Sequence, residues 1–272
     1  MVDKVLVSLD SSGHAAIVPA DLSADELLAQ IRAFNSRGVS NLNLEGVRLT
    51  ECGLADLDLQ LASLTGSVLR AVDFANANIA GAWLDGAQLE SVLMRGQRVK
   101  AASFQGSRLN STVFDKATVV GSNFQKTVIT AASIKGAAFH VTNFAGASIE
   151  HSDFGASSFS NCSFAYASLT EVSFAGATLF RSNMQVQSFS RVSLDAATIT
   201  ECDFSGVDLT GVNFGSCTLR LSNLIGCNLS GCDLSRVRLD EVSLRDADLR
   251  GCKLAGAKVK GCDLTNVKVE SA

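Results

Sequence analysis

The chain has 272 residues, with 23 Lys and Arg against 27 Asp and Glu, so its formal net charge is only −4. This balance excludes the strongly basic class of protein that binds nucleic acid directly through a basic face with aromatic side chains. The eight cysteines include no CxxC pair, which argues against a zinc cluster.

The first residues predict the compartment. The segment MVDKVLVSLDSS has Asp and Lys where a secretory signal requires an apolar run, and no stretch approaches the length of a membrane span. We therefore expect a cytoplasmic protein without a membrane partner, whose cysteines stay reduced.

Residues 1–38 lack the repeat that fills the rest of the chain and are predicted to form a small cap domain. The segments KVLVSL and HAAIV flank the turn residues DSSG, which predicts a β-hairpin. Ser23 and Glu26 then provide a capping box for an amphipathic helix. Its apolar face is expected to cover the open strand edges of the first coil, and it carries Leu27, Leu28, Ile31 and Phe34.

Residues 39–272 form the second predicted domain, and an uninterrupted five-residue period runs through it. Every fifth residue from Leu44 to Val269 is Leu, Phe, Ile, Val or Met, and the residue two places before each of these central residues is nearly always small. All eight cysteines occupy the small position. Neither a helix nor a strand has this period, so the chain is predicted to turn a corner every five residues. Most glycines lie two places after a central residue, where a type II turn requires a positive φ.

This pattern resembles the A(D/N)LXX motif of the pentapeptide-repeat family, as in ANANIAGAWLDGAQLE (75–90), FAGATLF (174–180) and RDADLRGCKLAGAKVKGCDLTNVKVE (245–270). The repeat covers about five-sixths of the chain. The resemblance implies an all-β solenoid, a right-handed quadrilateral β-helix in which four pentapeptides make one coil. About 11–12 coils spaced by ~4.8 Å give a rod roughly 55 Å long.

Each pentapeptide points one large and one small residue inward, which predicts a dry interior without room for a ligand. Free cysteine suits the small position as a small hydrophobe, and the stacked Cys232 and Cys252 are expected to lie too far apart for a disulfide. Gln97 and Gln187 occupy the same position although they are larger and polar. Each of these glutamines is therefore expected to be hydrogen-bonded or to widen its coil locally.

The repeat continues through Val269, which predicts an exposed last coil. We expect this coil to be buried in a homodimer or protected by charged residues. Lys258, Lys260, Asp263 and Lys268 are placed to give that protection.

Candidate catalytic residues are few. Of His14, His140 and His151, the last two are predicted to point outward on different faces, and the pattern places no Cys or Ser nucleophile beside them. The Asp and Asn residues that recur one place before the central residues are expected to bond neighbouring coils. No glycine-rich phosphate loop joins a strand to a helix. The sequence thus predicts no enzymatic activity, no cofactor and no metal.

Most outward positions carry small, polar or charged residues, so the large apolar exceptions indicate a candidate protein-binding stripe. The period of twenty places Val120, Val141, Phe180 and Leu221 on one face, and Trp83, Tyr166, Val186 and Ile225 on the next. His140, Arg181 and Arg220 interrupt the stripe. Aromatic residues beside Arg are typical of interface anchors.

Three functions follow from these observations. The first is a non-enzymatic rod that binds a partner protein through its faces or its tip. The family resemblance implies a second, mimicry of DNA at the binding site of gyrase or topoisomerase IV, with resistance to quinolones or toxins as the result; the near-neutral charge of this chain disfavours it. The third is a secreted effector or secretion-system component in which the N-terminal cap serves as a docking or export module.

Overall fold

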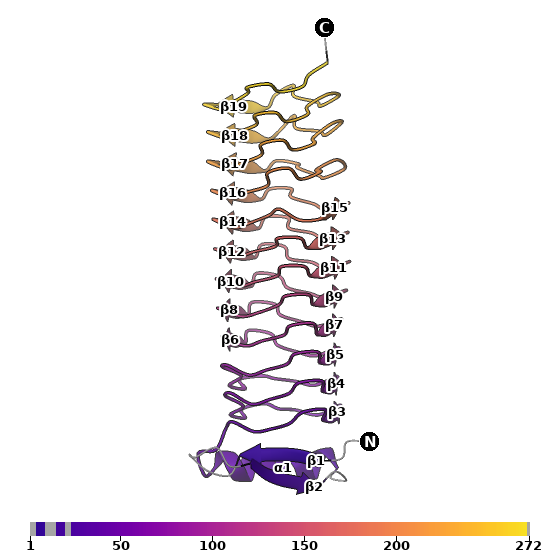
Figure 1. The fold of residues 1–272 in the computed structure, drawn as a ribbon, viewed down its shortest axis with the longest axis vertical. Coiled ribbons are helices and arrows are strands. Elements are labelled where there is room, and N and C mark those ends of the chain that lie inside the picture. The colour runs from indigo at the N-terminus through magenta and orange to yellow at the C-terminus, as the bar shows by residue number, and fades with distance from the viewer. Residues whose placement is uncertain (1–3, 9–14, 20–22, 271–272) are drawn as a thin grey trace.

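The computed structural model describes residues 4–8, 15–19 and 23–270, and it shows a straight rod with the N-terminal elements at one end (Figure 1). Strand β1 (Lys4–Ser8) pairs antiparallel with β2 (Ala15–Pro19), which confirms the predicted hairpin. The predicted turn residues DSSG and His14 lie outside the described residues.

Helix α1 (Ala24–Asn35) begins at the N-cap Ser23 with both hydrogen bonds of the predicted capping box. The Glu26 N–H donates to Ser23 Oγ at 3.3 Å, and the Ser23 N–H donates to Glu26 Oε2 at 2.8 Å. Leu27, Leu28 and Ile31 are buried in the same apolar core as the first coil. The helix therefore covers the end of the rod, as expected from its apolar face.

Asn35, the last residue of α1, joins the helix to the rod through its side chain. Its Nδ2 donates to the Asp58 carbonyl oxygen at 2.8 Å, and its Oδ1 accepts the Asp58 N–H at 2.8 Å. In later coils these backbone groups pair with the coil before them. The Asn35 amide thus replaces the strand neighbour that the first coil lacks.

Beyond the cap, each coil takes twenty residues, and residues twenty apart lie side by side in parallel register, as Arg48 and Val68 do. Four faces repeat along the rod. They begin with residues 43–45 (face 1), 48–50 (face 2), 53–55 (face 3) and 58–60 (face 4), and backbone ladders run along each of them. The structure is a parallel β-solenoid with four sides, which confirms the predicted fold class.

Two of the ladders are regular sheets. Face 2 carries an eight-stranded sheet made of β3 (Arg48–Thr50), β4 (Val68–Arg70), β5 (Gln88–Glu90), β7 (Arg108–Asn110), β9 (Val128–Thr130), β11 (Ser148–Glu150), β13 (Ser168–Thr170) and β15 (Ser188–Ser190). Face 4 carries a nine-stranded sheet made of β6 (Arg98–Lys100), β8 (Thr118–Val120), β10 (Ala138–His140), β12 (Ser158–Ser160), β14 (Thr178–Phe180), β16 (Thr198–Thr200), β17 (Thr218–Arg220), β18 (Arg238–Asp240) and β19 (Lys258–Lys260). Figure 1 shows the two sheets on opposite sides of the rod.

Stacked phenylalanine rings fill the middle of the rod. On face 1, the Phe104 and Phe124 ring centroids lie 4.6 Å apart and those of Phe144 and Phe164 lie 4.7 Å apart. Rings from opposite faces meet edge to face across the interior, as Phe104 of face 1 and Phe114 of face 3 do at 6.2 Å. Such aromatic pairs contribute about 0.5–1.5 kcal/mol each beyond their burial. The large inward position is thus the main source of packing energy, as its apolar composition predicts.

The corner position, two places after each central residue, is left-handed almost throughout the rod. Gly86 and Gly136 there have φ of 64° and 63°, which confirms the predicted positive φ. Residues with side chains adopt the same conformation, for example Asn161 at 54° and Val141 at 51°. Left-handed backbone costs an ordinary L-residue roughly 1–2 kcal/mol, so a bulky residue at a corner calls for an explanation.

One corner departs from the pattern and corrects two predictions. Val186 is buried, with 8% of its surface exposed, whereas Gln187 is exposed. The Val186 N–H donates to the Met184 carbonyl oxygen at 2.8 Å, and Gln187 N–H donates to the Ala167 oxygen, so the turn places Val186 inward one residue early. Burial of the apolar side chain in place of the amide is the physical reason, because a buried amide requires partners. Gln97 instead stays buried, and its Nε2 donates to the Ala77 carbonyl oxygen.

The small inward position holds the cysteines as predicted, and all eight thiols are free. Five of them are buried, at positions 162, 202, 217, 227 and 232. The Cys227 Sγ donates to the Phe204 carbonyl oxygen at 3.0 Å, and burial raises the pKa of this thiol to about 12. These groups are packing residues and not reactive thiolates.

Candidate protein-binding surface

The described part of the chain offers little for metal or acid–base chemistry. It contains no group of three or more His, Cys, Asp or Glu side chains that could hold a metal ion. His140 and His151 are exposed on different sides of the rod, as predicted, and His151 Nδ1 lies 2.8 Å from Glu171 Oε2. No helix among the described residues has the length and apolar character needed to cross a membrane.

Part of the predicted stripe is assembled by the face 4 sheet. The last residue of each face 4 strand points its side chain outward. In β8, β10 and β14 these residues are Val120, His140 and Phe180, and Ser160 of β12 lies between His140 and Phe180. Val120 and Phe180 are half-buried, whereas His140 is exposed. The three side chains therefore share one edge of the rod.

The corner between faces 4 and 1 adds Val141, Arg181 and Leu221 to this edge. Val141 is 54% exposed and is the only β-branched residue among the described non-glycine residues with left-handed backbone. Such a residue is a conformational outlier, and its exposed methyl groups gain little from packing. The position therefore combines an unfavourable conformation with an exposed apolar side chain, and strained residues of this kind cluster at functional sites.

Arg181 and Phe180 form one unit. The Arg181 guanidinium carbon lies 4.8 Å from the centroid of the Phe180 ring, and Arg181 Nε donates to Glu201 Oε2 at 2.7 Å. The ring is thus shielded on one side by a cation that is itself held by a carboxylate. A cation on an aromatic ring is worth about 0.5–1 kcal/mol at an exposed site.

Tyr166 lies across face 1 from Val141, at the corner between faces 1 and 2. It is 77% exposed and its backbone is also left-handed, with φ of 59°. Small side chains cover face 1 between the two corners, among them Asn143, Ala145 and Ser163. Val141 and Tyr166 therefore flank a low, even surface.

The structure does not bring together all ten residues of the predicted stripe. Trp83 is 49% exposed, but the ladder of face 1 places Ser103, Asn123 and Asn143 between it and the coil of Tyr166. Leu221 lies at the same corner as Arg181 but two coils further along the rod, and Ile225 lies on face 1 of the coil that follows Leu221. Val186 is buried and leaves the surface altogether. We use the name central stripe for the six residues that lie close together: Val120, His140, Val141, Tyr166, Phe180 and Arg181.

Three exposed apolar residues were missed by sequence reasoning. Leu61 is 51% exposed, Leu93 42% and Val128 39%. Leu61 occupies a left-handed corner, with φ of 59°, and Leu93 and Val128 lie one place before a central residue. The repeat register was the signal that could have found them, because these positions are outward in every coil.

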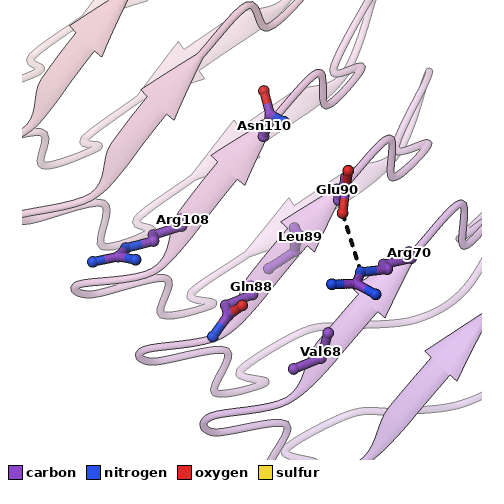
Figure 2. A pocket seen from close by; sticks show the side chains of 7 residues that line it. All are labelled: Val68, Arg70, Gln88, Leu89, Glu90, Arg108 and Asn110. Atoms are coloured by element: carbon purple, nitrogen blue, oxygen red, sulfur yellow. Dashed lines mark ion pairs between the residues drawn. The ribbon is translucent and has the colours of Figure 1, made fainter.

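The grooves on the outside of the coils are shallow. Figure 2 shows one of about 220 Å³ on face 2, lined by side chains of β4, β5 and β7. Arg70 Nε lies 3.1 Å from Glu90 Oε2, and both side chains are more than half exposed. An exposed ion pair of this kind contributes little energy, and the groove presents no buried polar group that would orient a ligand.

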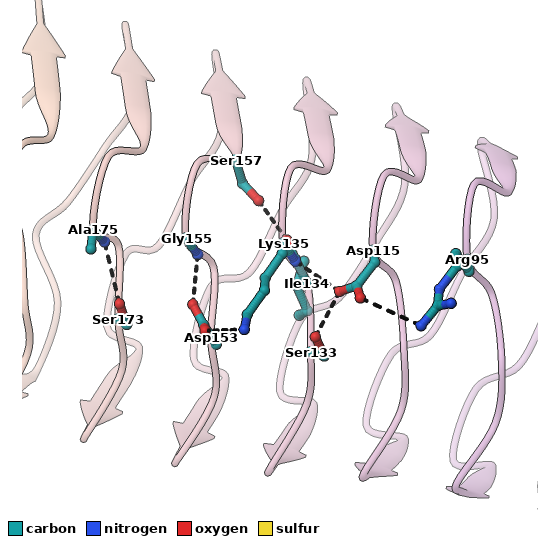
Figure 3. A network of polar contacts seen from close by, with 10 residues as sticks. All are labelled: Arg95, Asp115, Ser133, Ile134, Lys135, Asp153, Gly155, Ser157, Ser173 and Ala175. Carbon is teal, nitrogen blue, oxygen red and sulfur yellow. Dashed lines mark hydrogen bonds and ion pairs between the residues drawn. The ribbon is translucent and has the colours of Figure 1, made fainter.

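The recurring Asp and Asn residues bond their own corner more often than the neighbouring coil, which refines the prediction. Asp153 Oδ1, for example, accepts the Gly155 N–H at 2.8 Å. Bonds between coils also occur, as between Asn78 Nδ2 and Asp58 Oδ1 at 2.9 Å. In the face 3 network of Figure 3 a carboxylate one place after a central residue bonds the next coil, because Asp115 Oδ1 accepts hydrogen bonds from Ser133 Oγ at 2.7 Å and from the Lys135 N–H at 3.0 Å. Hydrogen bonding to the Asp153 carboxylate raises the pKa of Lys135.

The far tip of the described rod is open. Leu254, Val259, Leu264 and Val269 occupy large inward positions, yet between 40% and 61% of each is exposed. They line a hollow of about 320 Å³ together with buried leucines of the preceding coil. Of the four charged residues predicted to protect this tip, Asp263 is already engaged within the rod. Thr265 and Arg245 donate hydrogen bonds to its carboxylate and lower its pKa to about 2.

Comparison with known proteins identifies the repeat. The model described as "Pentapeptide repeat region" matches residues 197–272, and "Pentapeptide repeats (8 copies)" matches residues 54–90 and 157–185. Comparison with curated proteins gave no match.

Solved structures of pentapeptide repeat proteins align with this chain at low identity. HetL, a pentapeptide repeat protein involved in heterocyst differentiation regulation in the cyanobacterium Nostoc, is 19% identical over 90% of this chain and 96% of its own, with a TM-score of 0.37. A protein of the Arabidopsis thaliana thylakoid lumen is 22% identical over 34% of this chain and 65% of its own, with a TM-score of 0.33. QnrB1, a plasmid-mediated fluoroquinolone resistance protein, is 16% identical over 83% of this chain and 91% of its own, with a TM-score of 0.25.

Proposed function

The chain belongs to the pentapeptide-repeat proteins, and from this premise we propose that it is a non-catalytic cytoplasmic rod that binds a partner protein through the central stripe. The observation that carries this proposal is Val141, a β-branched residue with left-handed backbone and 54% exposure. Packing within the rod does not account for its presence, whereas contact with a partner does.

The composition of the central stripe supports a protein partner. Tyr166 offers a large exposed ring with a hydroxyl group, and Phe180 with Arg181 offers a preformed aromatic and cationic pair. Aromatic residues and Arg dominate the binding energy of protein interfaces. The rigid coils beneath them keep the ordering cost of binding low.

A pull-down from native cytosol with mass spectrometry tests the proposal. Wild type is compared with a Val141→Gly, Tyr166→Ser double variant and with a matched Val128→Gly, Thr130→Ser control on face 2. A protein retained by wild type and by the control but lost from the double variant supports the proposal. Retention of every partner by the double variant would refute it, and titration of the purified partner should show at least a ~30-fold loss of affinity.

DNA mimicry is the alternative that the family resemblance implied, and the charge distribution disfavours it. A mimic requires a continuous acidic surface. Residues 91–149 instead contain seven basic residues and one acidic residue, a net charge of +6. We call these seven residues the basic belt: Arg95, Arg98, Lys100, Arg108, Lys116, Lys126 and Lys135. Inhibition of gyrase supercoiling by the purified rod at micromolar concentration would overturn this preference.

A further inference from the structure

The basic belt follows directly on an acidic zone. Residues 41–90 carry seven acidic and two basic residues, a net charge of −5, and the sign then reverses within one coil. Neither zone is visible in the overall net charge of −4. A rod that needed charge only for solubility would have no reason to segregate it.

Five of the seven basic residues gather on faces 3 and 4. Arg95, Lys116 and Lys135 belong to face 3 and its corner with face 4, and Arg98 and Lys100 form the outward ends of β6. They span three neighbouring coils, or roughly 10–14 Å. This separation is close to the Debye length of about 8 Å at physiological salt, so their fields add.

Most of this charge is not neutralised within the rod. Asp115, the only acidic residue between 91 and 149, has Oδ2 3.8 Å from an Arg95 guanidinium nitrogen and is also engaged by Ser133 and the Lys135 backbone (Figure 3). Lys135 lies 3.0 Å from Asp153. Among the described residues, no carboxylate lies within 4 Å of Arg98, Lys100 or Lys116.

Lys116 stands at an exposed corner between two glycines. It occupies a left-handed corner with φ of 58°, and its neighbours in the same column are Gly96 and Gly136, with φ of 66° and 63°. The left-handed conformation is unfavourable for a lysine and natural for glycine. The flanking glycines leave its side chain without neighbours in its own column.

Apolar residues accompany the charges on face 3. Leu93 and Val113 pair in the ladder of this face, and Leu93 is 42% exposed while Val113 is half-buried. Each lies two residues before Arg95 or Asp115 along the chain. The surface therefore combines a short apolar strip with a cluster of unpaired cations.

We propose that faces 3 and 4 of the basic belt bind an acidic polypeptide segment with an apolar anchor, independently of the central stripe. The unpaired cations supply charge complementarity and steer the encounter, and Leu93 with Val113 receives the anchor. The length of the belt along the rod is close to that of a helix of about ten residues, which spans ~15 Å.

The same observations disfavour nucleic acid as the occupant. The phenylalanine rings between 91 and 149 are all buried, and the exposed His140 ring belongs to the central stripe, two coils beyond Lys100, so the belt itself contributes no ring on which a base could stack. Asp56 and Asp73 of the acidic zone lie on the same side of the rod, where they would repel a phosphate backbone that extends beyond the belt. A short acidic segment avoids both problems.

Fluorescence anisotropy with a labelled 12-residue peptide of Glu, Asp and Leu tests the proposal. We expect binding at 50 mM NaCl that weakens about tenfold or more at 300 mM NaCl, and no binding of a peptide with Gln and Asn in place of the acids. The Arg98→Glu, Lys100→Glu, Lys116→Glu variant should lose about tenfold or more in affinity. The matched control reverses three exposed cations elsewhere on the rod, Arg238→Glu, Lys258→Glu and Lys260→Glu, with the same change in net charge, and should keep the affinity.

The contrary outcomes are distinct. An equal loss in both variants would show a non-specific charge effect and overturn the proposal. Tighter binding of a 12-nucleotide single-stranded DNA than of the peptide would assign the belt to nucleic acid instead. Salt-sensitive dimerisation that the belt variant abolishes, without peptide binding, would identify the acidic zone of a second copy as the occupant. Thermal melting of each variant confirms that the exposed substitutions leave the coils folded.

Discussion

Replacement of Val141 by glycine separates the conformational cost of this residue from its packing. Left-handed backbone costs a bulky residue about 1–2 kcal/mol, and its removal offsets two losses. Glycine loses about 0.5–1 kcal/mol in backbone entropy, and the half of the valine side chain that is buried contributes about 1 kcal/mol. The expected change in the free energy of unfolding is therefore close to zero, within about 0.5 kcal/mol.

Val128→Gly is the matched control, because Val128 is 39% exposed and belongs to the ordinary strand β9 less than one coil away. It suffers the same two losses without relief of a left-handed conformation, so we expect it to destabilise the rod by about 1.5–2 kcal/mol. Urea unfolding followed by circular dichroism measures both variants in the same cooperative region. Equal destabilisation by the two substitutions would refute the reasoning, because Val141 would then hold no conformational strain for a partner to explain.

Three further outcomes are expected. Asn35→Ala removes both hydrogen bonds to the Asp58 backbone and should destabilise the rod by ~1–3 kcal/mol, with faster hydrogen exchange in the first coil; exchange that is unchanged there would contradict the cap role. Burial raises the pKa of the Cys217 thiol to about 12, whereas an unfolded thiol ionises near pH 8.5. Between these two pH values the folded state binds more protons than the unfolded state, so the free energy of unfolding should fall as pH rises above ~8.5. The fall is up to about 1.4 kcal/mol per pH unit for each such thiol. Cys217→Ala should lessen this fall, as measured by urea titrations at pH 7 and pH 10. The open apolar tip predicts a homodimer in sedimentation velocity, which Leu264→Lys abolishes; a monomer at high concentration would remove this prediction.

The repeat register made most of the fold predictable. A period of five with one large and one small inward residue fixes which side chains are buried, which corners are left-handed and which residues stack, because every coil repeats the same local geometry. The corner at Val186 and Gln187 shows where the register stops being sufficient. Gln97 follows a glycine and stays buried with a hydrogen bond, whereas Gln187 follows an apolar residue that can take its inward place. Which of the two residues points inward depends on the relative energies of two turn conformations, and the five-residue period does not determine those energies.

The candidate site was less predictable because it depends on distance along the rod. Sorting by a period of twenty grouped Trp83 with Tyr166, but it did not weigh the coils that lie between them. The basic belt was hidden for a related reason, since the acidic residues of one zone cancel the basic residues of the next in the total charge. A charge count along the sequence separates the two zones, and the arrangement of coils then shows which faces carry the charges.

The two proposed surfaces meet on face 4, and their junction distinguishes one partner from two. Lys100 of β6 pairs in register with Val120 of β8, so the edge of the basic belt adjoins the central stripe. A single partner that covers both should give an interaction energy between Lys100→Glu and Val120→Ser in a double-mutant cycle, because neighbouring residues under one interface are not independent. Two separate partners, each measured with the same variants, should each respond to one substitution and ignore the other. Additive effects on one partner would place both residues in its interface without direct coupling through a shared contact.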